Sequence, residues 1–137
     1  MLHLILRPIR PTDNTAIAAI IRKGLEDFNA HKPGTVYFDP TTDHLSDVFT
    51  VAGSTYFIAE ENGVMLGGAG IYPTANLPED TCELVKLYLS AAARGRGIGK
   101  LLMQQCLDAA AEKRVVIDQQ YAYCLFHTND SIGAGQA

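Results

Sequence analysis

The sequence predicts an α/β (α+β) protein in which a mixed, mostly antiparallel sheet is flanked by helices. Strand-like apolar runs alternate with two long amphipathic helical runs along the 137 residues. Two of the strand-like runs are joined by Asn62-Gly63, a dipeptide that favours a tight hairpin turn. The chain has no internal repeat or linker, so we expect one domain over 1–137. The expected order of elements is β-α-α-β-β-β-α-β.

The first half predicts one strand and two helices. Leu2–Leu6 is an apolar run that ends before two prolines. A helix is expected over Asn14–Phe28, because apolar residues recur there at helical spacing and a Thr-Asp pair before it can cap its first turn. Residues 29–40 contain two prolines and a glycine and are expected to form a loop, followed by a short helix over Thr42–Phe49.

The second half predicts a hairpin and then one more long helix between strands. The hairpin arms are Thr55–Glu60 and Val64–Tyr72. The second arm contains glycines at 67, 68 and 70, which are unfavourable in a strand and indicate a bulge or a close approach of another chain segment. The remaining expected elements are a strand at Thr81–Ser90, a helix at Gly97–Lys113 and strands at Arg114–Ile117 and Tyr121–Phe126.

Composition excludes several classes of protein. The net charge is −4, whereas a general nucleic-acid-binding protein is normally basic. The N-terminal apolar run is too short for a signal sequence or a membrane span, so we expect a cytoplasmic protein with no membrane or nucleic-acid partner. Neither cysteine nor histidine shows the spacing of metal ligands, so no metal site is expected. Cys82, Cys106 and Cys124 are expected to be buried apolar thiols.

Residues 94–100 read Arg-Gly-Arg-Gly-Ile-Gly-Lys, directly after an expected strand and at the start of an expected helix. Glycines leave backbone amides accessible, and the first amides of a helix have no partner within the helix. The positive end of the helix dipole and the side chains of Arg94, Arg96 and Lys100 add positive charge. This combination predicts a binding site for the phosphates of a cofactor.

Two familiar phosphate-binding motifs do not fit this segment. A P-loop needs a glycine where Arg94 stands and a hydroxyl residue where Leu101 stands. The dinucleotide fingerprint needs a glycine where Lys100 stands. A tight turn without a ligand needs only one glycine, so three glycines favour a binding role.

The pattern Arg94-x-x-Gly97-x-Gly99 after a strand resembles the acyl-CoA-binding motif of the GCN5-related N-acetyltransferase (GNAT) superfamily. The resemblance extends from Leu6 through Lys113 and includes the Asn-Gly hairpin and the strand Glu-Leu-Val-Lys-Leu-Tyr-Leu at 83–89. It implies a GNAT-like fold and acetyl-CoA as co-substrate.

The resemblance also implies roles for individual residues. The turn amides would hold the pyrophosphate of acetyl-CoA, and the amide of Leu87 would polarise the thioester. The amide near Leu89 and the side chain of Asn129 would contact the pantetheine arm. The implied cofactor-binding residues are Leu87, Leu89, Arg94, Gly95, Arg96, Gly97, Ile98, Gly99, Lys100 and Asn129.

Glu83 is the candidate general base that would deprotonate the acceptor amine. Some members of the superfamily carry a basic glutamate at its spacing from Arg94. Strand alternation predicts that Glu83 shares a face with Val85, Leu87 and Leu89, so apolar neighbours would raise its pKa. A solvated glutamate at the end of a strand is the alternative that the sequence leaves open.

The general acid, which would protonate the leaving thiolate, is expected in the part of the chain where the resemblance is weakest. Tyr123 is the candidate, with Tyr121 and His127 as alternatives. Members of the superfamily usually continue through a further helix and two strands, so the resemblance implies that C-terminal elements are missing. One explanation is a natural or artefactual truncation, such as one with a shifted reading frame after Lys113. The other is that a partner chain supplies the strands, as in a homodimer.

The sequence therefore predicts an N-acetyltransferase that moves an acetyl group from acetyl-CoA to a primary amine by direct attack. The acceptor would be a small-molecule or peptide amine, bordered by Tyr37, Phe38, Asp39 and Tyr72. The alternative is a non-catalytic acyl-CoA-binding or partner-binding module of the same fold.

Overall fold

The computed structural model describes residues 3–73, 80–113 and 116–117. Within these residues the chain forms a five-stranded sheet in the order β1-β2-β3-β4-β5. Neighbouring strands are antiparallel from β1 to β4, and β5 is parallel to β4, which confirms the expected mixed, mostly antiparallel sheet. The strand predicted at Tyr121–Phe126 lies outside the described residues. The strands are β1 Leu4–Pro8, β2 Thr55–Glu61, β3 Val64–Pro73, β4 Thr81–Leu89 and β5 Val116–Ile117.

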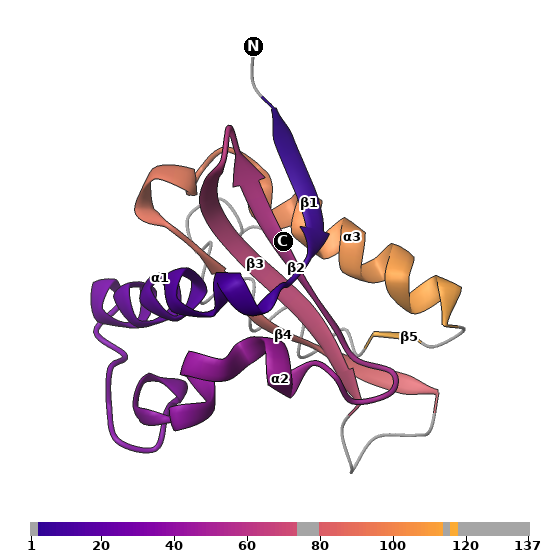
Figure 1. The fold of residues 1–137 in the computed structure, drawn as a ribbon, viewed down its shortest axis with the longest axis horizontal. Coiled ribbons are helices and arrows are strands. Elements are labelled where there is room, and N and C mark those ends of the chain that lie inside the picture. Colours follow the sequence, from indigo (N-terminus) through magenta and orange to yellow (C-terminus); the bar gives the residue numbers. More distant parts are fainter. Residues whose placement is uncertain (1–2, 74–79, 114–115, 118–137) are drawn as a thin grey trace.

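Helices cover both faces of the sheet. Figure 1 shows α1 and α2 on one face and α3 on the other. The helix expected over 42–49 is shorter than predicted, because His44 (φ −131°, ψ 44°) leaves the helical region and separates a 3-10 segment from one α-helical turn. The α-helices are α1 Asn14–Asp27, α2 Leu45–Val48 and α3 Ile98–Glu112. The 3-10 helices are η1 Pro11–Asp13, η2 Val36–Phe38, η3 Pro40–His44 and η4 Ala91–Ala93. No helix in the described ranges has the length and apolar character needed to cross a bilayer.

The sheet separates two apolar cores. The core under α3 contains both described cysteines together with residues of β2, β3 and β4. Burial raises the pKa of the Cys106 thiol to about 12, as expected for an apolar cysteine side chain. The core under α1 and α2 is smaller and consists of Ile17, Ile21, Leu25, Leu45, Phe49, Tyr56, Ile58 and Tyr88.

A buried carboxylate ties the first strand to the first helix. Arg7 donates two hydrogen bonds to Asp13, at 2.8 and 2.9 Å, and one to Glu60 of β2, at 2.7 Å. The backbone N–H of Arg10 also donates to Asp13, at 2.7 Å. These bonds hold the pKa of Asp13 below its usual value, chiefly through Arg7. They fix the angle at which α1 leaves the sheet edge.

The glycines of β3 make room for the ring of Tyr56. A β-carbon at Gly68 would lie 2.5 Å from Cε2 of Tyr56, and one at Gly70 would lie 2.7 Å from Cδ1 of the same ring. Such distances are too short for carbon atoms, so only glycine fits at either position. The close approach that the sequence predicted for these glycines is therefore confirmed. Asn62 (φ 52°) and Gly63 (φ 82°) form the predicted tight hairpin turn.

Candidate functional site

The segment between β4 and α3 is a glycine turn that faces open space. Arg94 has φ −68° and ψ 147°, and Gly95 follows at φ 78°. Gly97 has φ 80° and ψ 7°, the geometry of the third residue of a type II turn, where glycine is strongly preferred. A β-carbon at Gly95 or Gly97 would meet no atom within 4 Å. The backbone of the turn is thus accessible to a ligand.

The first amides of α3 point out of this turn. Leu101 N–H donates the first helical bond, to the carbonyl of Gly97 at 3.2 Å. The amides of Ile98, Gly99 and Lys100 precede that bond and take no part in the helical ladder. They lie at the positive end of the helix dipole, where negatively charged groups are stabilised. An open turn followed by such amides is an arrangement that suits negatively charged groups such as phosphates.

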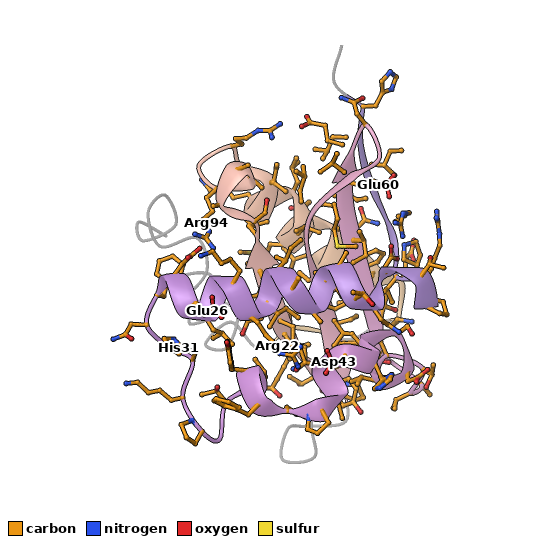
Figure 2. All side chains as sticks on the ribbon, turned by 60° about the vertical axis from the view of Figure 1, so that its left-hand side comes forward. Arg22, Glu26, His31, Asp43, Glu60 and Arg94 are labelled. Carbon is orange, nitrogen blue, oxygen red and sulfur yellow. The ribbon has the colours of Figure 1, made fainter. Side chains whose placement is uncertain are left out.

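The basic side chains around the turn take different positions. The Arg94 guanidinium donates to Asp27 at the end of α1 and to the carbonyl of Leu89 at the end of β4, both at 3.2 Å. It also lies 5.0 Å from the ring centroid of Phe28. Figure 2 shows Arg94 at the same end of α1 as Glu26. These contacts anchor the start of the turn to α1 and β4. Arg96 pairs with Glu61 at the end of β2, at 2.8 Å.

Lys100 is exposed in the first turn of α3, and Gly99 beside it is buried. Three basic residues were predicted around the turn: Arg94, Arg96 and Lys100. Among the described residues, Lys100 is the one of these three that forms no ion pair within 4.0 Å. Its ammonium is therefore the basic side chain most accessible to an anion at this helix end.

Strand β4 contains a bulge at its centre. Gly68 pairs with Tyr88 and Gly70 pairs with Val85, so two residues of β4, Lys86 and Leu87, oppose one residue of β3. Lys86 adopts φ 53°, the left-handed conformation that glycine usually supplies at such a bulge. Because an extra residue interrupts the ladder, backbone groups at the bulge are available for other partners.

The bulge overturns one prediction about Glu83. Leu87 and Leu89 lie in the core under α3, whereas Val85 packs against the core under α1 and α2. Glu83, two residues before Val85 in the regular part of the strand, therefore shares a face with Val85 but not with Leu87 or Leu89. The alternation failed because one inserted residue reverses the facing of every side chain beyond it. Glu83 is half-buried and pairs with Tyr72 of β3.

A buried tyrosine supports the bulge. Tyr56 of β2 is 1% exposed, and its ring crosses β3 over the glycines described above. Its hydroxyl donates to the carbonyl of Lys86 at 2.8 Å. Burial raises the pKa of Tyr56 well above its usual value, so the hydroxyl stays protonated and remains a donor.

A pocket of about 310 Å³ lies beside the bulge. Asp39 and Tyr72, two of the four predicted border residues, line it, whereas Phe38 is 58% exposed and does not. The Tyr37 hydroxyl instead donates to Glu26 of α1, at 2.5 Å. The complete lining is Asp39, Thr41, Val48, Phe49, Tyr72, Val85 and Lys86.

Lys86 and Tyr56 are the two site residues that sequence reasoning missed. The signal for Lys86 was a single charged residue inside the apolar run Leu84–Leu89, where regular alternation offers no simple place for it. The signal for Tyr56 was weaker, because only the neighbouring glycines of β3 indicated that a large ring would cross that strand.

The segment that carries Asp39 is held against α1. Arg22 donates to both carboxylate oxygens of Asp43, at 2.7 and 3.0 Å, and to the carbonyl of Tyr37 at 2.9 Å. Figure 2 shows Arg22 and Asp43 facing each other across these segments. The buried Thr42 hydroxyl donates to the carbonyl of Val36 at 2.7 Å. These bonds fix one wall of the pocket on a rigid helix.

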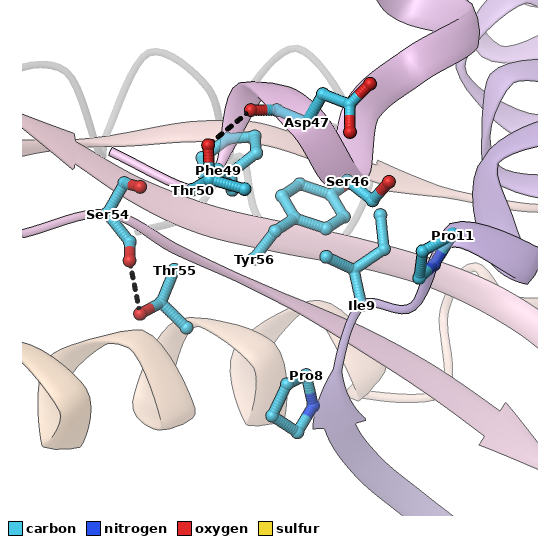
Figure 3. Close-up of a pocket in the computed structure, with 10 residues that line it drawn as sticks. All are labelled: Pro8, Ile9, Pro11, Ser46, Asp47, Phe49, Thr50, Ser54, Thr55 and Tyr56. Atoms are coloured by element: carbon cyan, nitrogen blue, oxygen red, sulfur yellow. Dashed lines mark hydrogen bonds between the residues drawn. The ribbon is translucent and has the colours of Figure 1, made fainter. Parts of the chain in front are cut away.

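A second pocket, of about 440 Å³, lies between the end of β1, the start of β2 and α2. Figure 3 shows Phe49 and Tyr56 among its lining residues, with Ile9 next to Tyr56. Phe49 also lines the pocket beside the bulge, so this ring separates the two cavities. The predicted residues Tyr121, Tyr123, His127 and Asn129 lie outside the part of the chain that the structure describes.

Comparisons with known proteins agree with this geometry. A family model described as "Acetyltransferase (GNAT) family" matches residues 19–127 of this chain. The uncharacterized N-acetyltransferase YjgM of Escherichia coli (strain K12) is 36% identical over 110 residues. That match covers 79% of this chain and 65% of YjgM, so the chain spans slightly less than two thirds of the length of this relative.

Solved structures share the fold. A GNAT-family acetyltransferase from Staphylococcus aureus Mu50 superposes with a TM-score of 0.70 at 16% identity, over 82% of this chain and 69% of the other. YncA from Salmonella typhimurium, solved with its cofactor acetyl-CoA, gives a TM-score of 0.68 at 22% identity, over 96% and 79% of the two chains. Fold, family match and relative agree, and the chain belongs to the acetyltransferase (GNAT) family.

Proposed function

We propose that this protein transfers an acetyl group from acetyl-CoA to a primary amine by direct attack. The observation that carries the proposal is the open turn at Gly95 and Gly97, which leads into the first amides of α3, ahead of the first helical hydrogen bond. YncA, a structural neighbour, was solved with acetyl-CoA, which supports the same co-substrate here. Acetyl-CoA, when bound, supplies a thioester whose carbonyl carbon accepts the amine.

The turn amides from Gly95 to Lys100 would bind the pyrophosphate, and the Lys100 ammonium would add charge there. Arg94 would contribute to pyrophosphate binding indirectly, because its guanidinium holds the start of the turn against α1. The bulge in the preceding strand would form the other end of the same site. The Leu87 amide would donate a hydrogen bond to the thioester oxygen as negative charge develops on it, and the backbone near Leu89 would align the pantetheine arm.

Proton transfer would involve residues on the pocket side of β4. Glu83 lies on the face of Val85, which lines the pocket, so it would accept the proton that the acceptor ammonium must lose before attack. Tyr123 remains the candidate for protonating the departing thiolate, and Asn129 the candidate contact to the pantetheine arm. Among the residues that the structure describes, no cysteine lines the pocket beside the bulge, in keeping with attack by the amine itself.

The turn can be tested with two glycine-to-glutamate variants that strain the backbone equally. Gly97 (φ 80°) and Gly63 (φ 82°) both have a left-handed backbone, and a side chain at either would enter open space. We expect Gly97→Glu to abolish acetyl-CoA binding in isothermal titration calorimetry, because a carboxylate would occupy the phosphate position. Gly63→Glu, in the hairpin turn, should lose the same stability and bind normally. Equal affinities in the two variants would refute the proposed site.

Thiol release from acetyl-CoA over a panel of primary amines tests catalysis separately. Turnover with at least one amine is expected for the intact protein. Tight acetyl-CoA binding without turnover on any amine would instead support the non-catalytic acyl-CoA-binding module.

A further inference from the structure

Lys86 occupies a backbone conformation that lysine does not favour. Within the described ranges it is the only residue with positive φ that is neither glycine nor asparagine. A left-handed backbone costs free energy for a residue with a β-carbon, and glycine would form the same bulge without that cost. Strained residues of this kind cluster at functional sites, where the side chain has a task. The bulge therefore explains why residue 86 has a positive φ, but it does not explain why this residue is a lysine.

The Lys86 side chain lines the pocket beside the bulge. Its neighbours there are mainly apolar or aromatic: Val48, Phe49, Tyr72 and Val85. The bulge places Val85 and Lys86 consecutively on the pocket wall, directly before Leu87, whose amide is proposed to bind the thioester. The pocket is about 310 Å³, which suits a small molecule rather than a folded protein segment.

The charges around this ammonium leave it open to an anion. Burial lowers the pKa of Lys86, and the nearby Asp39 carboxylate partly opposes that effect. Asp39 is itself engaged, because its Oδ1 accepts from the amide and the hydroxyl of Thr41, at 2.9 and 2.8 Å. Among the residues that the structure describes, Lys86 forms no ion pair within 4.0 Å. A half-buried cation beside a cavity, whose nearest described carboxylate, Asp39, lies beyond ion-pair distance, is stabilised by an anionic ligand group.

We propose that the acceptor is a small primary amine that also carries a carboxylate and an apolar group, and that Lys86 binds the carboxylate. The apolar walls would hold the rest of the molecule, and the ammonium would orient the amine toward the thioester. Lys86 is then a specificity-determining residue for the proposed acetyl transfer, on which this inference rests. An amine of the same shape without the carboxylate would lack the charge-assisted hydrogen bond to Lys86.

Matched acceptors that differ only in the carboxylate test the inference. L-leucine and L-phenylalanine are compared with their amides in a thiol-release assay, using the wild type, Lys86→Met, Lys86→Arg and Lys113→Met. We expect the wild type to prefer the amino acid to its amide by about 10- to 100-fold in kcat/KM, the range of a charge-assisted bond. Lys86→Met should remove that preference, and Lys86→Arg should keep part of it. Lys113→Met changes an exposed lysine at the end of α3 and should behave as wild type.

Binding separates this inference from the proposed activity. Calorimetric titration of the same four compounds into the protein with coenzyme A bound should show the same preference even if turnover is absent. Normal acetyl-CoA binding with equal affinity for acids and amides, or with no affinity for either acid, overturns the role of Lys86 alone. A preference that survives in Lys86→Met overturns it as well. If the wild type does not bind acetyl-CoA at all, the proposed function is refuted instead.

Discussion

Replacing Tyr56 by phenylalanine removes one oxygen atom from the centre of the protein, and the structure predicts a large effect. The hydroxyl is buried and donates to the Lys86 carbonyl at 2.8 Å. Without it, that carbonyl loses its tyrosine donor inside the core, which costs about 1–3 kcal/mol. Complete burial and the short distance favour a value of about 2 kcal/mol, or roughly 6 °C in Tm for a chain of this length.

The functional effect should be confined to the bulge. Lys86 is held at φ 53° against its own preference, and the hydrogen bond from Tyr56 helps to keep it there. Loss of that bond would let the neighbouring Leu87 amide move. We expect kcat to fall by about tenfold, because small displacements of aligned groups strongly reduce rates. The dissociation constant for acetyl-CoA should change little, since the glycine turn is a separate segment beyond the end of β4.

Tyr88→Phe is the matched control. Tyr88 is buried in the same core, but among the described residues its hydroxyl makes no hydrogen bond. Urea unfolding of both variants, together with calorimetry and steady-state kinetics, separates the two effects. If Tyr56→Phe were as stable and as active as Tyr88→Phe, the proposed support of the bulge would be refuted.

Two further predictions concern the charged groups that anchor the site. Arg94→Met should lower the free energy of unfolding by about 1–2 kcal/mol, because it removes the bond to the Leu89 carbonyl and the contact with the Phe28 ring. Asp27→Asn, which changes only the exposed partner of Arg94, should have a smaller effect in the same denaturation assay, and a larger one would contradict this assignment. Asp13 has a lowered pKa when folded, so its stabilisation is present above its unperturbed value of 3.8 and is lost as the pH falls from there through the folded pKa. Urea unfolding at neutral and acidic pH should show that Asp13→Asn is less sensitive to acid than the wild type, whereas parallel profiles would argue against this role.

Much of the architecture followed from local patterns. Apolar spacing predicted α1 and α3, and the Asn62-Gly63 turn predicted the β2–β3 hairpin, because these features depend on residues close together in the chain. The glycine turn could also be found directly, since left-handed residues before a helix need glycine. The family was recognisable for the same reason, as its motif is one short continuous segment.

The pocket and the bulge depended on contacts between distant segments. Strand alternation misplaced Glu83 relative to Leu87 because the one local signal, a lysine inside an apolar run, does not by itself specify an extra residue in the strand. That residue is accommodated by the Tyr56 hydroxyl, which comes from another strand and reaches it only across the glycines of β3. The sequence by itself predicted the proposed phosphate site, since the backbone of one continuous turn would form it. Only the tertiary structure decided which residues line the pocket beside the bulge, because packing across three strands sets the direction of each side chain there.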